Sequence, residues 1–452
     1  MLIVSAVVLV LGLATAPLAR AGAVARPPRV ANIPGQPVWV RATPPFRFRV
    51  WAIAAAVATV LTVGCMLFAP AFALAAAFLG LAVLGMITAI FRRYANGCDE
   101  VRAAADAFEP RIAMPYAGKV GIHIGMWSPW IERTGIPWVI VARTPALFDQ
   151  LAAMYPGTPI VQGAIPASVT GAFYSHGAES NVEFIDGSPA THVFLGHGDS
   201  DKPLSASERV LRYDIVAVAG QAAIDRFATA GLDVPAEKIR VIGRPQTEGI
   251  HTGAKRMPQQ PTVLYAPTWR HADDSLNVSS LAVADQIVQA LLDRGCTVHF
   301  RRHFAGQNHA EAESMIARVN EMLMADYEQT KRPHWWGVEA MERPLIEAFN
   351  DVDAMVSDIS GIVVDFMAST KPLVMYAAQF TDPDAFRAAH PTARAAYVID
   401  RDLTHLDAAL DAALGKDPLA PARSQYADYY LGGPDRAEPA RRFIELVEEL
   451  GS

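Results

Sequence analysis

The apolar and polar positions of this chain follow one pattern up to about residue 93 and a different pattern beyond it. Residues 2–19 carry no charge, and residues 50–91 are apolar apart from scattered Ser, Thr, Gly and Pro positions. A transmembrane helix needs enough apolar residues to cross roughly 30 Å of hydrocarbon. We therefore expect 1–93 to be a membrane region with three transmembrane helices, at 2–19, 50–69 and 71–91. A signal peptide is the alternative for the first, although its start lacks the usual Lys or Arg.

Basic residues beside these windows predict the topology. Six arginines and no acidic residue lie between residues 20 and 49, and Arg92 and Arg93 follow the third window. Because positive residues concentrate in cytoplasmic loops, both stretches are expected on the cytoplasmic side, with 50–91 as a hairpin. We therefore predict a multi-pass protein of the cell membrane whose large C-terminal part is cytoplasmic. If 50–91 is instead one long kinked or interfacial element, the topology is inverted.

From about residue 100, short apolar runs alternate with amphipathic segments, which is typical of parallel sheets covered by helices. The runs predicted as strands are 119–125, 138–143, 159–163, 191–198, 213–220, 238–245, 262–269, 296–303, 354–360, 371–377 and 396–400. The polar segment 247–261 ends in proline and is typical of a linker. The predicted fold class is α/β, with two Rossmann-type doubly wound domains, 100–246 and 262–452, that face a cleft. Ligands of such sheets bind beyond the carboxyl ends of the strands.

Composition and missing motifs exclude several functions. The net charge of −7 and the pI of about 6.0 provide no global basic field, so nucleic acid is not expected as a partner. The three cysteines are widely spread without CxxC spacing, which argues against a disulfide scaffold or a structural zinc site. The chain has no GxxxxGK(S/T) and no GxGxxG at its first predicted strand, which weakens ATPase and dinucleotide oxidoreductase functions.

Two polar clusters follow strands in the sequences "FLGHGDSDKP" and "VLYAPTWRHADD". In the first, His197 stands between two glycines that allow a sharp turn, so its imidazole is a candidate general base. In the second, Arg270 offers a planar fork that suits phosphate oxygens. The alternatives are a surface histidine in a turn and an arginine paired with Asp273 or Asp274.

A third cluster, "VHFRRHFAG", concentrates positive charge at another strand end. Arg301 and Arg302 are candidates for binding a diphosphate, and His303 for giving a proton or hydrogen bond to a leaving group. A solvated basic loop is the alternative.

The fourth cluster is "SDISGIVVDFMASTKPLVMY", where a strand runs into a helix. Ser360 and the amide of Gly361 stand at the predicted helix start, where unpaired amides favour phosphate, and Asp365 is a candidate acceptor for two ribose hydroxyls. The alternative is a helix cap at Asp358 or Ser360 with an exposed Asp365. Together the four clusters predict a nucleotide-diphosphate site opposite a base from the other domain.

The same motifs, with "GRPQTE" at 243–248, occur in the order found in the CDP-glycerol glycerophosphotransferase family, which includes the wall teichoic acid primases and polymerases. The chain resembles this family over about 190–450. The resemblance implies a GT-B-like fold with the acceptor side at 100–246 and the donor side at 262–452. It also implies transfer of glycerol phosphate from CDP-glycerol with release of CMP.

The resemblance further implies the roles of individual residues. His197 matches the histidine proposed to deprotonate the acceptor hydroxyl, and His303 is the second catalytic candidate. The implied substrate-binding residues are Gly198, Asp199, Ser200, Asp201, Arg270, Arg301, Arg302, Ser360, Gly361 and Asp365. No tightly bound metal and no cofactor are expected.

Two departures from the family pattern leave the donor open. Asp199 stands where the family usually has threonine, and Gly361 replaces a second serine, so CDP-ribitol or another CDP-polyol is an alternative donor. The expected partners are such a donor, a lipid-linked or polymeric glycan of the cell envelope as acceptor, and the membrane. Two other functions stay open: a GT-B glycosyltransferase that uses a nucleotide sugar, and a non-catalytic membrane scaffold for glycan assembly.

Overall fold

The computed structural model describes residues 29–35, 39–41 and 73–452 apart from 120, 199–206, 254–255, 271–276 and 304–309, with five single residues between 57 and 68. The predicted helix at 2–19 lies outside the described residues, and so does 50–69 except at those five positions. The third predicted helix, 71–91, corresponds to the start of a longer helix, α3 (Ala73–Asp106). No helix in the described part of the chain is both long and apolar enough to cross a membrane.

The described chain divides into two compact units, and unit 1 comprises Met1–Ile124, Gly135–Thr191 and Leu450–Ser452. Besides α3 it contains β1 (Arg29–Ala31), β2 (Trp39–Arg41), β3 (Ile112–Tyr116), β4 (Trp138–Ala142), α5 (Pro145–Met154), β5 (Ile160–Gln162), β6 (Gly171–Tyr174) and α6 (Val182–Ile185). These strands are hydrogen-bonded in the order β2-β1-β5-β4-β3-β6. Strands β3, β4, β5 and β6 pair in parallel, whereas β1 pairs antiparallel with both β2 and β5.

Unit 1 corrects the predicted strand at 119–125. A 3-10 helix occupies Gly121–Met126 instead, and the strands that sequence patterns missed are β1, β2, β3 and β6. Proline within an apolar run argues against a strand, and Pro115 stands inside β3. The five residues of β3 are all buried. Burial on both faces therefore outweighs this local signal.

Unit 2 comprises Gly125–Thr134 and His192–Glu449. After α4 (Ser128–Arg133), its elements are β7 (Thr191–Phe194), β8 (Ile215–Val218), α7 (Gln221–Thr229), β9 (Ile239–Val241), β10 (Thr262–Ala266), α8 (Ala284–Asp293), β11 (Thr297–Phe300), α9 (Ala310–Thr330), α10 (Gly337–Glu342), α11 (Leu345–Asn350), β12 (Ala354–Ser357), α12 (Gly361–Met367), β13 (Leu373–Ala377), α13 (Pro383–Ala389), β14 (Tyr397–Asp400), α14 (Leu406–Leu414), α15 (Ala420–Leu431) and α16 (Glu438–Gly451). Strands β7, β8 and β9 pair in parallel, and a second, five-stranded parallel sheet has the order β11-β10-β12-β13-β14. The predicted strands from 138 onward are thus confirmed, with ends shifted by a few residues.

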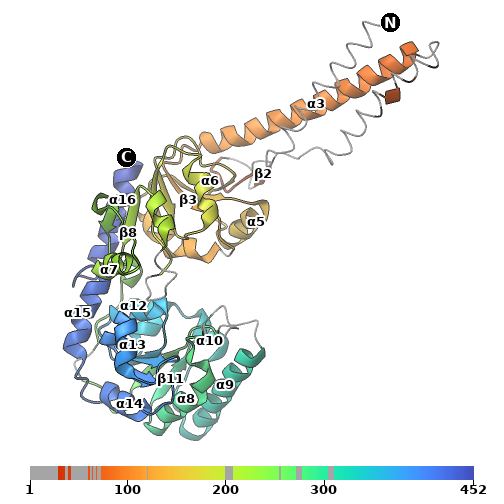
Figure 1. Ribbon diagram of the computed structural model, residues 1–452. Coiled ribbons are helices and arrows are strands. Elements are labelled where there is room, and N and C mark those ends of the chain that lie inside the picture. The colour runs from red at the N-terminus through yellow and green to blue at the C-terminus, as the bar shows by residue number, and fades with distance from the viewer. Residues whose placement is uncertain are drawn as a thin grey trace. The chain divides into compact units, whose positions relative to one another are not determined.

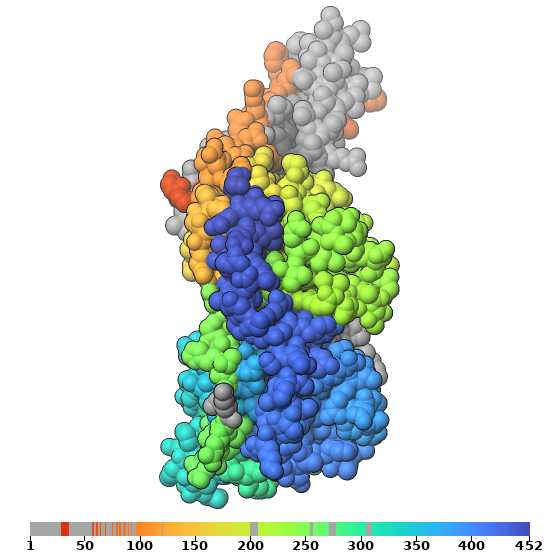
Figure 2. All heavy atoms as spheres, turned by 90° about the vertical axis from the view of Figure 1, so that its left-hand side faces the viewer, coloured from red at the N-terminus to blue at the C-terminus, as the bar shows by residue number. Residues whose placement is uncertain are grey.

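The five-stranded sheet is covered on both faces (Figure 1). Val263 and Tyr265 of β10 pack into one apolar cluster with α8 and α9, while Leu264 and Ala266 pack into another with α12 and α15. Side chains of a strand alternate between faces, so both faces of β10 are buried, as a doubly wound sheet requires. The structure therefore confirms the α/β class. Figure 2 shows C-terminal residues, in dark blue, at the surface.

Candidate active site

Three of the four predicted clusters meet at the carboxyl edge of the five-stranded sheet. Strands β11, β10 and β12 are neighbours. The amide of Arg301 donates to the Tyr265 carbonyl at 2.9 Å, and the Ser357 hydroxyl donates to the Ala266 carbonyl at 2.7 Å. The segments that follow these strands, Thr268–Arg270, Arg301–His303 and Asp358–Gly361, therefore lie at one edge. His303, Ser360 and Gly361 are half-buried there.

Asp358 holds two of these segments together. It is fully buried, and its carboxylate accepts hydrogen bonds from the Thr268 amide at 2.9 and 3.0 Å. It also accepts from the Ser280 amide at 2.9 Å and from the Ser280 hydroxyl at 3.1 Å. Asp358 therefore fixes the loop of Arg270 onto the end of β12. Sequence reasoning treated Asp358 only as a possible helix cap and missed this role.

The polar side chain at the start of α12 also does not act as a simple helix cap. Its N-cap residue is Ser360, whose side chain makes no capping hydrogen bond. The alternative in which these polar residues serve only as caps is therefore wrong.

The arginines at this edge contact acidic residues or carbonyls. Arg270 pairs with Glu311, and Arg302 pairs with Glu313 at 3.3 Å; both carboxylates belong to the first turn of α9. Arg301 donates from Nη1 to the carbonyls of Ala340 and Arg343 at 2.7 and 2.8 Å, and burial lowers its pKa. The guanidinium of Arg301 is thus fixed by the backbone, not held in a solvated loop.

Asp365 forms a buried ion pair with Arg244. The two residues are 8% and 4% exposed, and the Arg244 Nε donates to the Asp365 carboxylate. The alternative of an exposed Asp365 is therefore wrong. Arg244 belongs to the "GRPQTE" motif that follows β9, and this motif was the signal that could have identified it.

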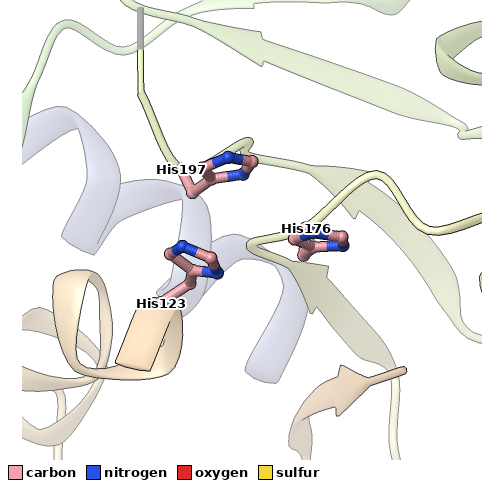
Figure 3. A group of neighbouring side chains, drawn as sticks. All are labelled: His123, His176 and His197. Carbon is pink, nitrogen blue, oxygen red and sulfur yellow. The ribbon is translucent and has the colours of Figure 1, made fainter. Parts of the chain in front are cut away.

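His197 lies on the exposed loop after β7, where Figure 3 labels it. The preceding Gly196 has a φ of +68°, and its carbonyl accepts a hydrogen bond from the Trp127 indole at 3.0 Å. Trp127 is buried and packs against Phe443, with ring centroids 5.0 Å apart. A rigid indole therefore anchors the loop that carries the candidate base. Gly198 is exposed on the same loop, while Asp199, Ser200 and Asp201 lie outside the described residues.

Two further histidines, which sequence reasoning missed, stack in unit 1 (Figure 3). The rings of His123 and His176 have centroids 5.6 Å apart and an interplanar angle of 20°. The Tyr116 hydroxyl bonds the His123 Nδ1 at 2.9 Å, and burial raises the pKa of Tyr116 to about 12. Burial lowers the pKa of His176, which favours the neutral imidazole. Neutral imidazoles are also metal ligands, so the expectation that no metal is needed stays a prediction.

The model of one protein family matches this chain. It describes CDP-Glycerol:Poly(glycerophosphate) glycerophosphotransferases and matches residues 194–389. A comparison with curated proteins gives no match.

Solved structures with some likeness include wall teichoic acid polymerase TagF (12% identity, TM-score 0.46, covering 88% of this chain and 97% of TagF). Two others are S. aureus MnaA with UDP (11% identity, TM-score 0.49, 75% of this chain and 96% of MnaA) and Anabaena HepE with UDP and glucose (14% identity, TM-score 0.44, 75% of this chain and 99% of HepE). These likenesses are distant, so the assignment of a function rests on the family match.

Proposed function

We propose a specific reaction for this chain. Its residues 194–389 belong to the CDP-glycerol:poly(glycerophosphate) glycerophosphotransferase family, so the chain is a glycerophosphotransferase. In this proposal it transfers glycerol phosphate from CDP-glycerol to a glycan of the cell envelope and releases CMP. One observation carries the proposal: the matched segment contains every site residue that the sequence indicated, from His197 to Asp365.

The proposed chemistry is a displacement at phosphorus. The acceptor hydroxyl oxygen attacks the phosphorus that carries glycerol, and the bond from that phosphorus to the oxygen of the CMP phosphate breaks. His197 takes the proton of the hydroxyl, for which its exposed position on an anchored loop is suitable. His303 gives a proton or a hydrogen bond to the departing CMP.

The proposed donor site uses the arginines at the carboxyl edge of the five-stranded sheet. Arg270 and Arg302 are paired with Glu311 and Glu313. A diphosphate offers the same guanidinium groups a stronger set of charged oxygens, so donor binding exchanges carboxylate for phosphate. Ser360 and Gly361 lie at the same edge of the sheet as these arginines. In this proposal the Asp365 carboxylate, which Arg244 orients, accepts a hydrogen bond from a hydroxyl of CDP-glycerol.

We also propose that the N-terminal apolar segments attach the enzyme to the cell membrane with its large C-terminal part in the cytoplasm, near a lipid-linked acceptor. The supporting observation is the arginine-rich segment between residues 20 and 49. Carbonate washing of membranes that contain the full-length chain tests attachment. A protein held by membrane-spanning segments stays with the membrane, whereas release into the wash refutes the proposal.

The reaction is tested with full-length protein, CDP-glycerol and a membrane extract as the source of acceptor. We expect release of CMP, and we expect His197→Ala to abolish it. His251→Ala, at an exposed histidine outside the site, is the matched control and should retain activity. CMP release that survives His197→Ala would remove the assignment of the base. Thermal protection by UDP-sugars but not by CDP compounds would refute the proposed donor.

A further inference from the structure

Unit 1 contains a cavity that the proposed reaction has not used. It has a volume of about 230 Å³ and is lined by residues that include Arg143, Gly163, Ile165, Glu183 and Phe184. Arg143 directly follows β4, and Gly163 directly follows β5. The cavity therefore lies at the carboxyl ends of two parallel strands, where α/β sheets bind ligands.

The rim of the cavity has both a cation and an anion. The Arg143 Nε donates to the Glu183 Oε2 at 3.0 Å, and its Nη2 donates to the Glu183 Oε1. The two side chains are 26% and 53% exposed, so a ligand can reach both. This pair offers donors and acceptors side by side, and the carboxylate opposes the binding of an anion.

The remainder of the lining is apolar and partly backbone. Ile165 and Phe184 are 8% and 5% exposed. Gly163 has a φ of +116°, and a Cβ added there would meet no atom within 4 Å. The left-handed conformation thus explains the glycine, and it leaves the backbone uncovered beside an apolar floor.

Gln162 is next to Gly163 in the chain, but it is not one of the residues that line the cavity. This last residue of β5 stands immediately before Gly163 and is 4% exposed. In the described part of the chain, neither its carboxamide oxygen nor its nitrogen has a hydrogen-bond partner. A buried polar group without a partner is costly.

We propose that this cavity binds one neutral sugar unit, and, if the proposed function holds, that this unit belongs to the acceptor glycan. The volume is below the roughly 300–1,000 Å³ of sites for drug-sized ligands, so it suits a monosaccharide better than a nucleotide. Sugar hydroxyls donate to Glu183 and accept from Arg143, and the C–H face of the ring packs on Phe184. Glu183 binds the single Arg143 through two hydrogen bonds, whereas three arginines share the proposed donor site, so the Glu183 carboxylate disfavours a phosphate-bearing ligand here.

The test is ligand-observed saturation-transfer NMR with the full-length protein and no donor. The probes are methyl glycosides of glucose, galactose, mannose and N-acetylglucosamine, with glycerol phosphate and CMP for comparison. We expect binding of at least one glycoside and a loss of about tenfold in its affinity in Glu183→Gln. Asp407→Asn, which breaks the exposed Arg294 ion pair of 2.7 Å in unit 2, is the matched control.

A second variant separates binding from folding. Arg143→Gln removes the cation of an exposed ion pair that lines the cavity, so it should leave the melting temperature nearly unchanged while it weakens glycoside binding. Absence of binding by every glycoside, or binding unchanged in both variants, overturns the inference, and so does preferential binding of glycerol phosphate. Glycoside binding without CMP release from CDP-glycerol would reject the proposed reaction and leave the sugar site intact. CMP release without glycoside binding would support the proposed reaction and reject the sugar site.

Discussion

Replacing Asp358 with Asn perturbs the contact that holds the loop of Arg270. The carboxylate accepts from the Thr268 and Ser280 amides and from the Ser280 hydroxyl, over 2.9–3.1 Å. An Asn side chain keeps one acceptor and turns the other into a donor. With its oxygen at the Oδ2 position, its NH₂ group faces the Thr268 amide; in the flipped orientation it faces the Ser280 amide. In each orientation the NH₂ group therefore faces at least one backbone N–H, which is also a donor.

The magnitude follows from these contacts. A hydrogen bond to a charged acceptor contributes about 1.5–3 kcal/mol, and Asp358→Asn loses at least one. The gain from no longer burying a charge offsets part of this loss. We expect the free energy of unfolding to fall by about 2 kcal/mol. We also expect the KM for CDP-glycerol to rise about tenfold, because the loop of Arg270 is no longer fixed.

Urea unfolding and steady-state kinetics of the full-length protein measure the two effects. The matched control is Ser357→Ala, which removes one neutral hydrogen bond, to the Ala266 carbonyl at 2.7 Å, without touching the loop. It should cost about 1 kcal/mol and leave the KM unchanged. An Asp358→Asn protein that retains both its stability and its KM would refute the reasoning.

Two further predictions concern buried charge. Arg244→Met and Asp365→Leu should each destabilise the protein by about 3 kcal/mol, because each leaves the other charge buried without its partner, and the double variant should recover most of this loss in urea unfolding. Strictly additive losses would contradict a coupled pair. Burial lowers the pKa of His299 from 6.5 to about 4. The unfolded chain therefore binds this proton first as pH falls, and stability decreases from about pH 6.5 to pH 4, by up to about 3 kcal/mol. His299→Leu should flatten the dependence of unfolding free energy on pH in this window, whereas the exposed His251→Leu should not; an unchanged slope in His299→Leu would contradict the assignment.

The sequence predicted the five-stranded sheet well. Strands such as "TVLYA" and "AMVS" are buried apolar runs between polar segments, and that local signal survives folding. It failed at four strands of unit 1, of which β1 and β2 have only three residues each and β3 contains Pro115. Short strands depend on their neighbours for stability, so their own residues carry little signal.

The clusters at strand ends were also predictable, because parallel strands bring their carboxyl ends to one edge. The partners within each cluster were not. Asp358 meets a residue 90 positions away, Arg244 meets one 121 positions away, and the Gln162 carboxamide is buried by a sheet with a non-sequential strand order.

The sequence by itself thus determined the α/β class, the order of the motifs and the positions of the charged candidates, since these depend on local pattern. Only the tertiary structure decided that Asp358 is a buried clamp, that Asp365 belongs to an ion pair with Arg244, and that Arg143 and Glu183 border a cavity. The physical reason is that burial and pairing depend on which distant segments the sheets bring together.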